Sequence, residues 1–112
     1  MARRNKWIAH FYMNAYPRLK RIANRNGYAL AVHGSLQRDC DLIAVAWTEN
    51  AKPPIDMIKK MQGVFGLTYR KTKRDIFTKK PHGRLAYSLV CPCGYFDISV
   101  IPPKRKRPGR TE

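Results

Sequence analysis

Apolar and polar residues follow two different periods along this chain, and the first period is helical. Apolar side chains recur at helical spacing from Trp7 to Ala15, shortly after Asn5, which is a favourable helix cap. Pro17 either kinks this helix or occupies the first position of a second one. Gly27 then provides a C-terminal stop. We therefore expect the first quarter of the chain to be helical.

Extended segments dominate the rest of the chain. The pattern predicts strands at 28–33 and 39–47, a helix from Pro53-Pro54 to Gly63, short strands at 67–71 and 75–78, and a hairpin of 84–91 and 95–101 across 92–94. The order α-β-β-α-β-β-β indicates the α+β class, with a mixed or antiparallel sheet covered by helices.

Length and composition favour a single domain. The chain has 112 residues, and domains cluster near about 100–150 residues. Hydrophobic residues make up 44% of it, which argues against a wholly disordered protein. We expect one domain at residues 1–102 and a basic, disordered tail at residues 103–112, where no apolar residue occurs.

Secretion and membrane insertion are not expected. The longest apolar runs, such as Leu42 to Trp47, are far shorter than the roughly 20 residues that cross a bilayer. The basic start of the chain lacks the apolar segment and cleavage site of a signal peptide. The 3 cysteines, an odd number, fit a reducing compartment better than a disulfide framework. These features predict a cytoplasmic protein without a membrane partner.

The charge of the chain is strongly positive. The 23 Lys and Arg against 7 Asp and Glu give a formal net charge of +16, which attracts polyanions such as nucleic acid. The candidate nucleic-acid-binding residues are Arg18, Arg21 and Arg25 on the outer face of the helix, and Lys104, Arg105, Lys106 and Arg107 in the tail. Among the aromatic residues, Tyr28, Tyr69 and Tyr87 are the better candidates for stacking on bases, because they lie near basic residues.

Against this basic background, three of the few acids fall on predicted strands. Asp39 and Asp41 are two residues apart, so both carboxylates point to one face of an extended strand. Asp97 lies within a second apolar strand. A carboxylate there needs an ion pair, a hydrogen bond or a metal ion, because an isolated buried charge is unfavourable. The three carboxylates are therefore the candidate catalytic residues and the candidate ligands of two Mg²⁺ ions.

The loop between the first two strands offers groups that bind phosphate. Gly34-Ser35 directly follows a strand, where a turn presents backbone N–H groups and a hydroxyl. Arg38 either neutralises a triphosphate or pairs with Asp39 or Asp75. These residues form the first part of a candidate nucleotide-binding set.

A second loop, ahead of the hairpin, supplies the rest of that set. Lys80, His82 and Arg84 either face a phosphate or belong to a solvated turn. His33, at the end of a strand, is better explained as a core or turn histidine than as a catalytic base.

Gly34-Ser35, Asp39-x-Asp41 and Asp97, in this order, resemble the signature of the nucleotidyltransferase superfamily of the polymerase-beta type. Three blocks are also similar to small phage-encoded nucleotidyltransferase-like proteins, and together they lie within residues 28–102. The blocks are residues 33–47, 80–88 and 95–102.

The resemblance implies a minimal nucleotidyltransferase fold and Mg²⁺-dependent transfer of a nucleoside monophosphate from a nucleoside triphosphate. The acceptor, a nucleic acid or a protein, is not specified. The resemblance also implies the host cytoplasm for a phage-encoded protein, and a partner protein, because minimal members are often paired with one. The basic charge and the short link between Ser35 and Asp39 favour an alternative, a non-catalytic nucleic-acid-binding or host-factor-modulating phage protein on the same fold.

Overall fold

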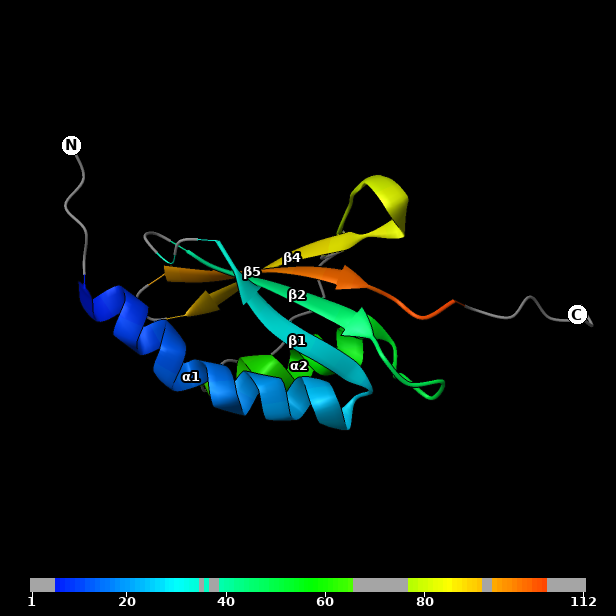
Figure 1. The fold of residues 1–112 in the computed structure, drawn as a ribbon, viewed down its shortest axis with the longest axis horizontal. Helices are drawn as coiled ribbons and strands as arrows, with labels where there is room; N and C mark the ends of the chain where they lie inside the picture. Colours follow the sequence, from blue (N-terminus) through cyan, green and yellow to red (C-terminus); the bar gives the residue numbers. More distant parts are fainter. Residues whose placement is uncertain (1–5, 35, 37–38, 66–76, 92–93, 105–112) are drawn as a thin grey trace, which may run out of the picture.

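The structure is a computed structural model, which describes residues 6–34, 36, 39–65, 77–91 and 94–104. Two helices and a five-stranded sheet account for most of these residues (Figure 1). In chain order the elements are α1 (Lys6–Arg25), β1 (Tyr28–His33), β2 (Cys40–Ala46), α2 (Pro54–Val64), β3 (Thr78–Lys79), a short 3₁₀ turn (Pro81–Gly83), β4 (Leu85–Cys91) and β5 (Gly94–Ile101). In this part of the chain, no helix is long and apolar enough to cross a membrane.

The sheet has the strand order β1-β2-β5-β4-β3. β2 and β5 are parallel neighbours, whereas the other three strand pairs are antiparallel. The prediction of an α+β protein with a mixed sheet is therefore confirmed. The hairpin has a tighter turn than expected, because Cys91 pairs with Gly94 across two residues. Of the two short strands, the one expected at 75–78 is observed at Thr78–Lys79, and residues 75–76 lie outside the described residues. The other, at 67–71, also lies outside them.

α1 is one continuous helix with Pro17 inside it, so no second helix begins there. Its inward stripe of Tyr12, Ala15 and Leu19 is buried in the core. Proline has no N–H to donate to the carbonyl four residues earlier, which belongs to Met13. Both residues lie on the exposed side of the helix, where water can bind that carbonyl. The helix therefore tolerates a proline at this exposed position, whereas a proline on the buried side would break it.

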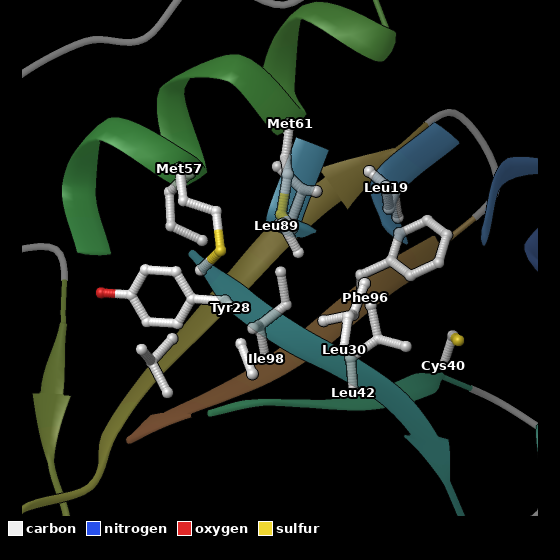
Figure 2. Packing of buried hydrophobic residues seen from close by; sticks show 14 of the residues in the cluster. Leu19, Tyr28, Leu30, Cys40, Leu42, Met57, Met61, Leu89, Phe96 and Ile98 are labelled. Carbon is white, nitrogen blue, oxygen red and sulfur yellow. The ribbon is translucent and has the colours of Figure 1, made fainter. Parts of the chain in front are cut away.

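Both helices pack on one face of the sheet, and the core lies between them and the strands (Figure 1). Phe96 of β5 contacts the Tyr12 and Phe65 rings, with centroids 5.0 and 5.5 Å away. Figure 2 shows Met57 and Met61 pointing from α2 towards the buried face of the sheet. The opposite face carries no helix in the described part of the chain, and it is the face on which the candidate site lies.

Gly27 joins the end of α1 to the segment that follows β2. Its φ of +89° favours glycine, and a Cβ there would lie 2.6 Å from the Ala51 Cα. The N–H groups of Trp47 and Thr48 both donate to the Gly27 carbonyl, at 2.8 and 3.2 Å. These contacts fix the backbone at the C-terminal end of β2.

Tyr28 makes the stability of the fold depend on pH in the alkaline range. The ring is 1% exposed, and its hydroxyl donates to the Lys52 carbonyl at 2.6 Å. Burial, and secondarily the negative charge of Asp56, raises the pKa of Tyr28 to about 12. The unfolded chain ionises this phenol near its ordinary pKa of 10.0, so the folded state binds more protons above that pH. The contribution of Tyr28 to the free energy of unfolding is therefore complete below pH 10 and declines as the pH rises towards 12.

Tyr28→Phe tests this assignment. At neutral pH the variant should lose about 0.5–1.5 kcal/mol of unfolding free energy, because the hydrogen bond to Lys52 is gone. Between pH 10 and 12 its stability should then fall less steeply than that of the wild type. Urea unfolding at a series of pH values measures both effects, and equal slopes for the two proteins would contradict the assignment.

Candidate functional site

Two of the three predicted carboxylates lie side by side on the open face of the sheet. Asp41 of β2 and Asp97 of β5 are directly paired in the parallel register. His33 is the β1 partner of Asp41, and Ser88 is the β4 partner of Asp97. These four residues form a row across four strands, which we call the acidic row.

The alternation of side chains along each strand places this row away from the core. Cys40 and Leu42, the neighbours of Asp41 in β2, are fully buried beneath the helices. Phe96 and Ile98 are buried in the same way on either side of Asp97. Successive side chains of a strand point to opposite faces, so the carboxylates face the open side of the sheet. Both are only half-buried there, and they remain accessible to a ligand.

The acidic row concentrates negative charge in a basic protein. Neighbouring strands lie about 4.8 Å apart, so two carboxylates at paired positions repel each other. Ser88 Oγ donates a hydrogen bond to Asp97 Oδ1 at 2.9 Å, which holds one carboxylate in place. The remaining oxygens of this pair are suited to a cation, which would offset the repulsion.

Gly34 brings the backbone against this carboxylate pair. Its φ is +87°, and a Cβ at this position would lie 2.7 Å from Asp41 Oδ2. The backbone conformation strains any other residue here, and a Cβ would in addition displace the Asp41 carboxylate. Two residues later, Leu36 has a φ of +61°, an unusual value for a branched side chain. The first residue of the Gly-Ser pair therefore lies next to Asp41.

The other predicted members of this loop are only partly placed. Asp39 lies directly before β2 and is half-buried. Ser35 and Arg38 lie outside the described residues. Within the ranges that the structure describes, no three His, Cys, Asp or Glu side chains come together as a metal-binding group. Asp41 and Asp97 do fit Mg²⁺, which proteins often bind through one or two carboxylates with water and substrate phosphates as further ligands.

A groove of about 470 Å³ lies beside Asp97 and brings basic residues near the acidic row. Lys80 lines it together with Ser88 and Ser99. Arg84 Nη1 donates to Ser99 Oγ at 2.9 Å, which holds the guanidinium beside the same groove. The groove therefore has the Asp97 carboxylate and Lys80 in its lining, and the Arg84 guanidinium lies next to it.

The turn before β4 explains how these cations are positioned. The Lys80 N–H donates to the Arg84 carbonyl at 2.8 Å, which closes the turn. His82 lies within the turn with a φ of +65° and is exposed to solvent. Lys80 and Arg84 thus lie next to the groove, whereas His82 does not line it.

Three residues of this site were not identified from the sequence. Ser88 and Ser99 project from the hairpin onto the open face, and the strand period would identify them once the two-residue turn is known. His33 is exposed at the end of β1 and paired with Asp41, so of the two alternatives, a core or a turn histidine, the structure excludes the core one.

The basic residues predicted to bind nucleic acid are exposed wherever the structure describes them. Arg18, Arg21 and Arg25 lie on the outer face of α1, and Lys104 follows β5. Arg105, Arg107 and Lys106 lie outside the described residues. Of the candidate stacking residues, Tyr28 is buried, Tyr87 is half-buried and Tyr69 is not described.

Comparisons with known proteins provide no family assignment. No family model matches the chain, and searches of curated proteins and of solved structures find no match either.

Proposed function

We propose that the protein is a small Mg²⁺-dependent nucleotidyltransferase of the polymerase-beta type. One observation carries the proposal: Asp41 and Asp97 are paired on adjacent parallel strands, with Gly34 packed against the Asp41 carboxylate. This arrangement joins Gly34, the DxD strand and the later aspartate strand in one place. The repulsion between the carboxylates supplies the physical reason for a cation.

The surrounding residues have complementary roles in this proposal. Asp41 and Asp97 would hold the metal, and Asp97 would also orient the acceptor hydroxyl. The hydrogen bond from Ser88 fixes Asp97 Oδ1 in place. Lys80 and Arg84 bind the negative charge of the triphosphate and of the departing pyrophosphate. A bound Mg²⁺ would polarise the phosphoryl group and lower the pKa of the attacking hydroxyl.

The metal dependence of transfer tests this function. Purified protein is incubated with each of the four α-³²P-labelled ribonucleoside triphosphates, Mg²⁺ or Mn²⁺, and RNA, single-stranded DNA or a protein extract as acceptor. We expect labelled nucleotide on one acceptor class and release of pyrophosphate, both abolished by EDTA and restored by added Mg²⁺. Transfer that persists in EDTA would contradict the proposal, as would the absence of transfer to every acceptor.

A second function is favoured by a separate observation. Arg18, Arg21 and Arg25 present one exposed basic stripe on α1, away from the core. A protein that only binds nucleic acid would use this stripe and would not depend on the acidic row. Its binding would weaken with salt and would be insensitive to metal chelation. The transfer assay above separates this alternative from the enzyme.

A further inference from the structure

Trp47 is the most exposed large apolar side chain in the described part of the chain. It follows β2 directly and is 78% exposed, although the sequence pattern placed it at the end of a buried strand. A tryptophan ring in water leaves a large apolar area unburied, and such positions commonly mark a binding surface. The Trp47 N–H is hydrogen-bonded to the Gly27 carbonyl, so the backbone that carries the ring is fixed.

The ring lines a second groove, of about 590 Å³, at the C-terminal end of the parallel strands. β2 and β5 end on the same side of the molecule, so the segments that follow them lie together (Figure 1). Thr48, Glu49 and Asn50 supply polar groups to the groove, and Pro103 and Lys104 close it from the segment after β5. An exposed aromatic ring, hydrogen-bonding side chains and a lysine thus share one site.

Basic residues surround this end of the molecule. Lys104 lines the groove, and Arg25 lies in the last turn of α1, two residues before the glycine that binds the Trp47 N–H. The Lys52 N–H donates to the carbonyl of Asn26 at 2.9 Å, which places a further exposed cation beside the end of α1. Glu49 is the one acid among the described lining residues. The two charges of the lining, Glu49 and Lys104, balance each other. Arg25 and Lys52, which lie beside the groove at the end of α1, make the surrounding rim positive, and this complements a phosphate backbone.

We propose that this groove binds single-stranded nucleic acid, with one base stacked on Trp47 and the adjacent phosphates held by Lys104. Stacking needs an unpaired base, because the faces of paired bases are covered within a duplex. Thr48 and Asn50 line the same groove and carry the polar groups available to the edge of the stacked base. The positive rim distinguishes this partner from a second copy of the chain, whose net charge of +16 would repel it.

The groove is separate from the acidic row. Trp47 is six residues beyond Asp41 along β2, a distance of about 20 Å at the rise of a strand. Binding here needs neither metal nor nucleoside triphosphate, so the inference does not rest on the proposed transferase function. The groove is a site for a nucleic-acid strand whether or not that strand is the acceptor of the proposed nucleotide transfer.

Fluorescence anisotropy of a labelled single-stranded oligo(dT) of about 12 nucleotides, in EDTA and without nucleotide, tests the site. Trp47→Ala should weaken binding at least about fivefold, and Trp47→Phe should retain part of the affinity. Met13→Ala, which truncates an apolar side chain that is 44% exposed on α1, serves as the matched control and should bind like the wild type.

The salt dependence distinguishes stacking from charge. Trp47→Ala should leave the slope of log K against log salt unchanged, whereas Lys104→Gln should reduce it by about 0.7. Trp47→Ala should also remove most of the preference for the single strand over a duplex of the same length. Wild-type affinity in Trp47→Ala would overturn the inference. The inference would also be overturned if Trp47→Ala reduced only the self-association seen in sedimentation and left nucleic-acid binding intact. The groove would then bind a second copy of the chain.

Discussion

Asp41→Asn and Asp97→Asn are each expected to abolish nucleotide transfer while leaving the protein folded. Each substitution keeps the size of the side chain but removes one charge from the pair that binds the metal. Loss of a metal ligand removes several kcal/mol of transition-state stabilisation, so we expect transfer to fall by at least about 100-fold. The same substitutions relieve repulsion between paired strand positions, so the unfolding free energy should stay constant or rise by a few tenths of a kcal/mol. Denaturant unfolding and the transfer assay measure the two quantities on the same preparations.

Asp56→Asn is the matched control for this pair. Asp56 lies in the first turn of α2, on the helical side of the sheet, and is also half-buried. Its replacement should leave transfer at the wild-type level. Full transfer by Asp41→Asn, at unchanged stability, would remove the acidic row from the mechanism. Loss of transfer together with loss of the fold in all three variants would show that the acids act structurally.

The sequence placed Asp41 and Asp97 in apolar strands but predicted neither the face on which the pair lies nor which strands are neighbours. In the structure both carboxylates lie opposite the buried residues of β2 and β5. Their pairing depends on a parallel register between segments 56 positions apart, which is set by packing across the whole core. Local sequence patterns carry no information about such a register.

The length of the hairpin turn, which is one residue shorter than the sequence predicted, also changes which residues are paired. A three-residue turn at 92–94 would place Ile98 opposite Ser88, whereas the observed two-residue turn places Asp97 there. Because side chains alternate with a period of two, this shift decides which residue can bind the Asp97 carboxylate. Ser88 could therefore not be predicted as the partner of Asp97 before the length of the turn was known. Trp47 was misplaced for another reason: apolar character alone does not show where a buried strand ends.

Gly34→Ala is expected to impair the site through the carboxylate it touches. Alanine at a φ of +87° loses about 1–3 kcal/mol of stability from the backbone alone. In addition, its Cβ would lie 2.7 Å from Asp41 Oδ2, so the carboxylate must move from its observed position. We expect a loss of transfer larger than the loss of stability explains, measured as turnover of fully folded protein below the unfolding transition.

Two other glycines and a double variant separate these effects. Gly83 has a φ of +74°, and no atom lies within 4 Å of the place that a Cβ would take, so Gly83→Ala measures the backbone strain without the collision. Gly63 lies inside α2 with equal space, so Gly63→Ala should be neutral or stabilising and should transfer normally. In an Asp41→Ala background the collision is absent, and Gly34→Ala should then destabilise the protein only as much as Gly83→Ala does. An unchanged effect of Gly34→Ala in that background would show that strain in the loop, and not contact with the carboxylate, accounts for the requirement for glycine.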